Sequence, residues 1–561
     1  MSERRTRKLF GALISACALA ATSMSLVPPA AADEVPAKAK WTQAYIESGD
    51  GTMLHADILR PKGLDKNDKT PVILSIGPYF GSGTGAYPVP TPTENGPIMR
   101  FPELFTDGKI MERGYTWVQV DLRGFGGSQG CGDLGGPGEQ ADVTAAVEWA
   151  AKQPWSTGKV GMWGKSYDAW TQIMGLASKP KGLAAAVVQS PIIQGYRTFY
   201  MNGVHYDSGW YGTPGLYAGY DLLPNSINAN PESHLNATTG TATNPDCYAT
   251  NQAGALQDDP KADYWKDREL IKKAGRSKTP VLWSHGFNDA NTKPDNFLDV
   301  YSKLRGPKRA WFGQYDHMRG NESNFVGREG FMDEAMRWFD RYLKGKKSAR
   351  VGRDPGVEIQ QGDGRWRAEK HWPPMDASRY SMPVRKGSYA DQDGNTADGS
   401  NAGHGSWSIS QKLPYDVHLA GVPKLTAKVK TMAPNAHLVG LLYDIDNKGV
   451  ATLITRGAYL LREGGKISFG LYPQDWRIDK GHRIGLLLSG SDDSWFMPGM
   501  THTEVPVTGG SVSLPFLRYD RDNFLKGGPA GAMSTRQPFP VEKSALKNRG
   551  VKAKLPRKLK G

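Results

Sequence analysis

The chain has 561 residues, which is too many for a single hydrophobic core, so two or three domains are expected. Its content of 39% apolar and 10% aromatic residues excludes a chain that is disordered throughout. The net charge of +14 is not accompanied by any nucleic-acid-binding motif, so a nucleic-acid partner is not expected.

Residues 1–32 predict a secretory signal peptide. A basic start is followed by an apolar run from Leu9 to Leu26, and Ala30-Ala31-Ala32 offers a cleavage site of small residues. Ile14-Ser15-Ala16-Cys17 also resembles a lipoprotein processing site, but the apolar run continues well past Cys17, so lipidation ranks second. No other stretch is long and apolar enough to cross a membrane. We therefore expect a secreted protein without a transmembrane segment.

Export has consequences for the cysteines and for the basic C-terminal end. Cys131 and Cys247 remain after signal removal, and in an oxidising compartment they are expected to pair. The run from Lys543 to Lys560 contains no acidic residue, so residues 541–561 form a basic tail. Such a run is typical of a solvated, mobile end, and its functional alternative is loose attraction to an anionic polymer of the cell envelope.

Residues 40–350 predict an α/β domain. A hairpin is expected over residues 41–61, around the turn Ser48-Gly49-Asp50-Gly51. Apolar strands and helices then alternate: strands at 71–76, 115–120, 160–163, 183–188, 279–284 and 309–312, and helices at 139–152, 171–179 and 331–343. Alternation at this spacing indicates a parallel sheet with helices on both faces.

The link between strand 160–163 and helix 171–179 has the pattern of a nucleophile elbow. It reads Gly164-Lys165-Ser166-Tyr167-Asp168. A serine on such a sharp turn stands clear of the sheet, and the N–H groups of the new helix face the oxyanion that its attack creates. The pattern G-x-S-x-G is only partly met, because Asp168 holds its last position. A plain serine helix cap is the structural alternative.

The strand–helix alternation is interrupted once and then ends. Residues 192–274 are rich in Tyr, Trp, Asn and Gly, which predicts a helical cap insertion over the carboxyl edge of the sheet, where ligands bind. The alternative is a small helical subdomain packed by its aromatic residues. Residues 351–540 show short alternating runs between turns, which predict an all-β sandwich or jelly roll. Residues 444–449 imitate a calcium loop, but Lys448 stands where an oxygen ligand is needed and Thr455 where the bidentate glutamate would be, so a hairpin turn and no metal site are expected.

The residues required for acyl transfer occur in a suitable order. A nucleophilic serine needs a base, an acid that holds the base, and an oxyanion site. Ser166, Asp289 and His317 follow one another along the chain, each just beyond an expected strand. His285 competes for the role of base, and Asp316 competes for that of the acid.

Several motifs resemble the Xaa-Pro dipeptidyl-peptidase and cocaine-esterase-like (CocE/NonD) family of serine hydrolases. The motifs are SGDGTMLHADILRP at 48–61, GPYF at 77–80, DLRGFGGSQG at 121–130, WGKSYD at 163–168, GFND at 286–289 and YDH at 315–317, with YDIDNKG, ITRGAY and GHRIGLLLSGS in the β region. The resemblance implies an α/β-hydrolase fold with a cap and a C-terminal jelly roll. It also implies an oxyanion hole formed by the backbone N–H of Tyr167 and the hydroxyl of Tyr79. Ala169 departs from the glycine usual in the family.

The sequence thus predicts a secreted serine hydrolase that cleaves peptide, amide or ester bonds through Ser166, Asp289 and His317 and needs no cofactor. A dipeptidyl-peptidase acting on Xaa-Pro peptides must hold a free ammonium, for which the insertion offers Asp207, Asp221 and Glu232. A carboxylesterase or acylase of the cocaine-esterase type is the alternative, with the same catalytic residues and a small acyl substrate. An inactive cell-surface binding protein is the second alternative.

Overall fold

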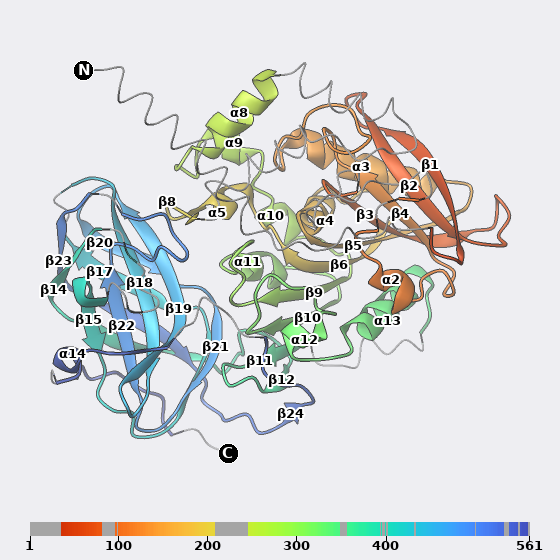
Figure 1. Cartoon of the computed structure of the whole chain (residues 1–561). Coiled ribbons are helices and arrows are strands. Elements are labelled where there is room, and N and C mark those ends of the chain that lie inside the picture. Colours follow the sequence, from red (N-terminus) through yellow and green to blue (C-terminus); the bar gives the residue numbers. More distant parts are fainter. Residues whose placement is uncertain are drawn as a thin grey trace, which may run out of the picture.

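The computed structural model describes residues 35–80, 96–97, 99–207, 245–347, 356–392, 394, 399, 402–430, 433–499, 501–531, 538–547 and 550–558. Figure 1 shows an α/β unit beside a β-rich unit, drawn in blue, that contains the C-terminal part of the chain. The expected signal peptide with Cys17 lies outside the described residues, as do Asp221, Glu232 and residues 208–244 of the insertion.

The α/β unit is built on an 11-stranded sheet. Its order is β1-β2-β4-β3-β5-β6-β9-β10-β11-β12-β24, and the strands from β4 to β11 in this order are parallel. The bounds are β1 Ala39–Glu47, β2 Met53–Pro61, β3 Thr70–Gly77, β4 Thr116–Asp121, β5 Ser156–Ser166, β6 Leu183–Pro191, β9 Val281–Gly286, β10 Lys308–Gly313, β11 Val357–Gln360, β12 Trp366–Glu369 and β24 Phe524–Leu525. The predicted hairpin pairs β1 with β2, and each predicted strand of the domain is present.

Helices cover both faces of this sheet, as the apolar runs of the sequence predict. In β3, Leu74 packs in a core with α3 (Pro137–Lys152) and α4 (Tyr167–Ser178), whereas its neighbour Ile73 packs in a second core with α2 (Glu103–Thr106) and α13 (Phe331–Leu343). Successive side chains of a strand point to opposite faces, so a strand buried on both sides has an uninterrupted apolar sequence. The smaller helices α11 (Phe297–Tyr301) and α12 (Ser323–Val326) follow β9 and β10.

The sheet continues beyond residue 350, where the sequence analysis places the end of the α/β domain. Strand β11 pairs in parallel with β10, and β12 turns back antiparallel to β11. Val357 and Ile359 of β11 are buried in the core of the α/β unit. A short strand can join either a parallel or an antiparallel sheet, so its local pattern does not assign it to a domain.

The C-terminal unit consists of two antiparallel sheets. One has seven strands: β13 Ser378–Val384, β14 Gly387–Ala390, β16 Val417–Gly421, β17 Lys424–Val429, β20 Gly465–Gly470, β21 Gln474–Ile478 and β23 Glu504–Phe516. The other has five: β15 Ser406–Ile409, β18 Ala436–Ile445, β19 Val450–Leu461, β22 Arg483–Ser489 and β25 Phe539–Pro540. Leu425 of β17 and Leu442 of β18 share one core, so the sheets face each other. The segment 444–449 lies at the turn of the β18–β19 hairpin, as expected.

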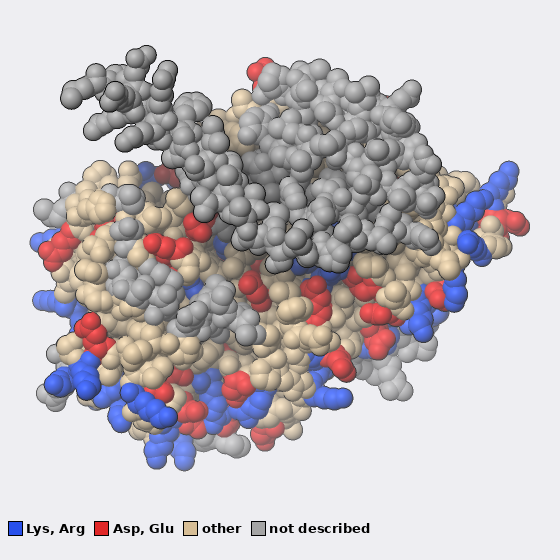
Figure 2. Space-filling view, in the orientation of Figure 1, with Lys and Arg blue, Asp and Glu red and all other residues tan. Residues whose placement is uncertain are grey.

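The described part of the basic tail is attached to the β unit, which corrects the expectation of a solvated, mobile end. After α14 (Lys543–Lys547), the N–H of Val551 donates to Ile409 O over 2.9 Å, and that of Lys554 donates to Ser381 O over 2.9 Å. Val551, Ala553 and Leu555 alternate with polar residues, and this spacing of two lets them pack on the β core while the lysines face solvent. Figure 2 shows further Lys and Arg side chains at the lower left, over this unit.

The described parts of the insertion form a small aromatic layer. It comprises α5 (Gly195–Phe199), the two-stranded pair β7 (Tyr200–Met201) and β8 (Val204–His205), and α8 (Pro245–Ala255), α9 (Asp263–Lys266) and α10 (Ile271–Ala274). Cys247 of α8 forms a disulfide with Cys131, with the Cα atoms 6.5 Å apart. Asn251 donates to Gly132 O over 2.7 Å, so α8 is attached to the loop that follows β4. None of the described helices has the length and apolar character that a membrane crossing requires.

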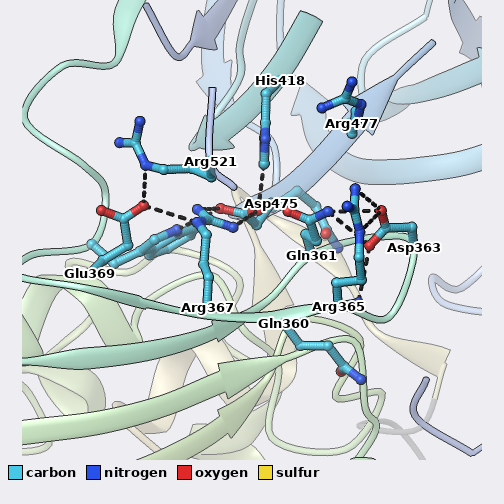
Figure 3. Close-up of polar contacts among 12 residues, drawn as sticks. Gln360, Gln361, Asp363, Arg365, Arg367, Glu369, His418, Asp475, Arg477 and Arg521 are labelled. Carbon is cyan, nitrogen blue, oxygen red and sulfur yellow. Dashed lines mark hydrogen bonds and ion pairs between the residues drawn. The ribbon is translucent and has the colours of Figure 1, made fainter. Parts of the chain in front are cut away.

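A buried ion cluster joins the two units (Figure 3). Arg367 of β12 donates to both oxygens of Asp475 on β21, with both N···O distances 2.7 Å. His418 of β16 and Trp372 also contact this carboxylate, at 2.7 and 3.0 Å. Burial by itself would raise the pKa of Asp475, but the positive charge of Arg367 and the contact with His418 outweigh it and lower the pKa. The carboxylate therefore stays charged and holds β21 against the edge of the large sheet.

Substituting Asp475 tests this junction. Asp475→Asn removes the carboxylate that pairs with both terminal nitrogens of the buried Arg367 and leaves only Glu369, 2.9 Å from its Nε. This should lower the free energy of unfolding by about 3–5 kcal/mol, measured by urea denaturation. Asp363→Asn is the matched control, because Asp363 pairs with Arg365 where both side chains are exposed, by 38% and 45%. We expect it to cost at most about 1 kcal/mol. Equal losses of unfolding free energy in the two variants would contradict the role of Asp475 in joining the two units.

Candidate active site

Ser166 lies at a sharp turn between β5 and α4. Its backbone has φ 65° and ψ −123°, a conformation that a non-glycine residue adopts only when its surroundings impose it. A Cβ on Gly164 would lie 2.6 Å from the carbonyl oxygen of Asp168, so only glycine lets the chain turn back this closely. Ser166 is the residue before the first turn of α4, which places its side chain at the N-terminal end of that helix.

Other loops meet Ser166 at the carboxyl edge of the sheet. Ser166 pairs with Pro191 at the end of β6. The preceding residue, Ser190, also has positive φ, at 40°, and its hydroxyl donates to Met318 O over 3.0 Å. Its own carbonyl accepts from the hydroxyl of Thr292 over 3.2 Å. The end of β6 therefore links the elbow to the loops that carry Asp289 and His317.

Asp289 and His317 are in direct contact. The Oδ2 atom of Asp289 lies 2.9 Å from Nδ1 of His317, and it also accepts the hydroxyl of Thr292 over 2.8 Å. The backbone N–H groups of Asn291 and Thr292 donate to Oδ1 over 2.9 and 2.8 Å. Asp289 is fully buried, which by itself would raise its pKa, but His317 and these donors lower it overall. The carboxylate is ionised and orients an imidazole that is 16% exposed.

The two competing residues have other environments. His285 is completely buried, its Nε2 lies 3.6 Å from Asp289 Oδ2, and burial lowers its pKa to about 4. It therefore stays neutral under the ring of Phe297, whose centroid is 4.9 Å away. Asp316 accepts the backbone N–H groups of Ala290 and His317, each over 2.8 Å. Its carboxylate thus holds the two loops together and does not orient the ring of His317.

The two tyrosines expected at the oxyanion site have different surroundings. The hydroxyl of Tyr167 donates to both oxygens of Glu139, at 3.0 and 2.8 Å, inside the core. The side chain of Tyr167 therefore points away from solvent, and what the residue offers at the elbow is its backbone N–H. Tyr79 follows β3 and is 8% exposed. The guanidinium carbon of Arg100 lies 3.7 Å from the centre of its ring.

The C-terminal unit supports the loop that carries Asp289. The side-chain amide of Gln474 on β21 donates to Asn288, next to Asp289, over 3.3 Å. Gln314 donates to Gln474 over 3.2 Å, and Lys293 places its ammonium 4.9 Å from the ring centre of Trp495. Sequence reasoning missed these contacts and also Arg100, since none of these residues lies in a recognisable motif and each acts on a partner far away in the chain.

A cavity of 860 Å³ lies between the insertion and the β unit. Gln194, shortly after the end of β6, lies on one side, and Tyr459 of β19 lies on the other. Acidic side chains outnumber basic ones in its lining: Asp258, Asp259, Glu269 and Asp295 against Arg197 and Arg462. Arg462 pairs with Asp258 and Arg197 with Asp295, so Asp259 and Glu269 remain in excess and favour a ligand with a positive group. Asp207, one of the carboxylates considered for this role, is exposed and is not among the lining residues.

Comparisons with known proteins agree with this architecture. Residues 50–319 match X-Pro dipeptidyl-peptidase (S15 family), and residues 349–532 match the X-Pro dipeptidyl-peptidase C-terminal non-catalytic domain. A relative from Streptomyces avermitilis, provisionally named Xaa-Pro dipeptidyl-peptidase, is 25% identical over 84% of this chain and 83% of its own length.

Solved structures share the fold over both units. A CocE/NonD family hydrolase from Staphylococcus aureus is 18% identical, with a TM-score of 0.65 over 85% of this chain and 94% of that chain. An alpha-amino acid ester hydrolase is 18% identical, with a TM-score of 0.64 over 88% of this chain and 99% of that chain. With its consecutive catalytic and C-terminal matches, this chain belongs to the X-Pro dipeptidyl-peptidase (S15) family of serine hydrolases.

Proposed function

We propose that the protein is an exported exopeptidase that releases Xaa-Pro dipeptides through a Ser166–His317–Asp289 triad. The observation that carries the proposal is the 2.9 Å contact between the buried carboxylate of Asp289 and Nδ1 of His317, combined with a serine held at positive φ at the end of β5. With Nδ1 bound to Asp289, the Nε2 atom of His317 is left to take a proton.

The reaction follows from these roles. The Ser166 hydroxyl attacks the carbonyl carbon while His317 accepts its proton, and the N–H of Tyr167 and the hydroxyl of Tyr79 bind the resulting oxyanion. The tetrahedral intermediate expels the amine of the leaving peptide, which takes the proton from His317, and an acyl-enzyme on Ser166 remains. Water then gives its proton to His317 and attacks the ester carbonyl. His317 returns that proton to Ser166 Oγ as the dipeptide leaves, which restores the serine.

The acidic cavity supports a substrate with a free ammonium group. An exopeptidase that removes a dipeptide from the N-terminus must recognise the terminal ammonium group. Carboxylates are the strongest neutralising partners of an ammonium group. The excess of carboxylates in the cavity lining fits this requirement. Tyr196 and Tyr459 line this cavity, and their rings are flat surfaces of the kind that suit a proline ring.

Triad substitutions test the catalytic roles. Ser166→Ala, His317→Ala and Asp289→Asn should each lower kcat by about 10⁴-fold, because removing one member disables the unit. Asp316→Asn is the control, since its carboxylate binds backbone N–H groups and not the imidazole ring. Turnover of an Xaa-Pro anilide gives the rates. A larger loss in Asp316→Asn than in Asp289→Asn would assign the acid role to Asp316.

The buried His285 predicts how stability depends on pH. Its pKa is lowered from 6.5 to about 4 in the folded protein, so below pH 6.5 the unfolded chain binds a proton that the folded chain does not. Stability should therefore fall by up to about 3 kcal/mol as the pH drops from 6.5 to 4. In His285→Gln, the free energy of unfolding should change less between pH 6.5 and pH 4, as measured by urea denaturation at each pH. The variant should keep its turnover at pH 7.5. A loss of turnover like that of His317→Ala would make His285 the base.

The substrate class is tested by blocking the ammonium. An Xaa-Pro anilide with a free amine should be cleaved at least about 100-fold faster, in kcat/KM, than its N-acetylated form, because the blocked substrate leaves the carboxylates unpaired. The rate on the free anilide should fall near pH 8 as the amine loses its proton. A short-chain ester is assayed alongside. If both anilides were cleaved equally and the ester faster, the protein would be an esterase.

A further inference from the structure

Asp168 occupies the last position of the nucleophile motif, where glycine is usual, and it is completely buried. Its carboxylate fills the space beside Gly77, where an added Cβ would lie 1.7 Å from Oδ1. The hydroxyl of Thr171, one turn further along α4, donates to Ile76 O over 2.8 Å. The start of α4 is therefore packed against the turn that leads from β3 to Tyr79.

Arg100 connects this carboxylate to the face of Tyr79. Its Nε donates to Asp168 Oδ2, and its guanidinium carbon lies 3.7 Å from the centre of the Tyr79 ring. The side chain of Arg100 is 18% exposed, so both contacts are largely screened from water. Burial raises the pKa of Asp168 to about 6, while the positive charges of Arg100 and, further away, Arg319 and Lys165 act in the opposite direction.

Such an arrangement has two physical effects on a tyrosine. A cation over the ring is attracted to its negative face, which restrains the plane of the ring and hence the position of the hydroxyl. A nearby positive charge also stabilises negative charge that moves toward the phenol oxygen, so the hydroxyl becomes a stronger donor to an anion. Both effects are largest where water is excluded.

We propose that Arg100, held by Asp168, positions and polarises Tyr79 for donation to the oxyanion. This inference depends on the proposed function, in which Tyr79 is an oxyanion donor. Arg100 and Asp168 are positioning residues, since they act through Tyr79 and not on the substrate. Asp168 thereby anchors the guanidinium at the elbow itself.

A double-mutant cycle between Arg100 and Tyr79 tests the proposal. Tyr79→Phe removes the donor and should lower kcat by about 100-fold. Arg100→Gln should lower kcat by about tenfold with KM changed less than twofold. In the Tyr79→Phe background, Arg100→Gln should change kcat less than twofold, because its route of action is gone. Arg100→Lys, which keeps a cation for the ring, should recover part of kcat.

A transition-state analogue separates positioning from general structural support. The affinity for a dipeptide boronic acid, which forms a tetrahedral adduct with the serine, should fall in parallel with kcat in Arg100→Gln. Unfolding midpoints verify that each variant is folded. If Arg100→Gln does not fold, the same comparison of kcat and boronic acid affinity is made with Arg100→Lys. A full tenfold loss from Arg100→Gln in the Tyr79→Phe background, or a change in KM alone, overturns the inference and leaves Tyr79 as donor. An unchanged kcat in Tyr79→Phe overturns both this inference and the proposed role of Tyr79 as oxyanion donor.

Discussion

The candidate site depends on a buried negative charge, the carboxylate of Asp289. A charge without solvent must be compensated by hydrogen bonds, and Asp289 receives them from His317, from the hydroxyl of Thr292 and from the backbone that follows it. Since Thr292 also bonds to Ser190 at the end of β6, compensating the charge fixes the loops after β6, β9 and β10 relative to one another. The orientation of the His317 imidazole is therefore a consequence of burying the Asp289 carboxylate.

The same edge of the sheet stores backbone strain. Ser166, Ser190 and Lys293 all have positive φ values, of 65°, 40° and 64°, although none of them is glycine. Each is followed or flanked by packed structure: α4 after Ser166, the Met318 contact at Ser190, and the rings of Tyr206 and Trp495 around Lys293. Rigid surroundings thus maintain the positive φ of Ser166 at the turn between β5 and α4.

The C-terminal unit is part of the support of the site and not only an attached domain. Asp475 anchors β21 to the large sheet through Arg367, and its neighbour Gln474 bonds to Asn288, next to Asp289. Strand β21 thus carries both Asp475 of the ion cluster and Gln474, whose amide restrains the loop of Asp289. Asp475 is therefore connected to Asn288 by one peptide bond and one hydrogen bond.

The sequence by itself determined the parallel sheet, the elbow and the short strands of the C-terminal unit, because hydrophobic period and turn residues are local properties. It also brought out Ser166, Asp289 and His317 as candidates, because parallel strands end at one edge and thereby align residues that follow them. Only the tertiary structure showed that Asp289 contacts His317, that His285 is fully buried and that Asp316 accepts backbone N–H groups, since the distance and burial of a side chain depend on the packing of several elements. It likewise decided that β11 belongs to the large sheet, that the tail packs on the β core, and that Arg100 lies over Tyr79. These last contacts join residues distant in the chain, and no local pattern encodes which distant partner a strand edge or a cation will meet.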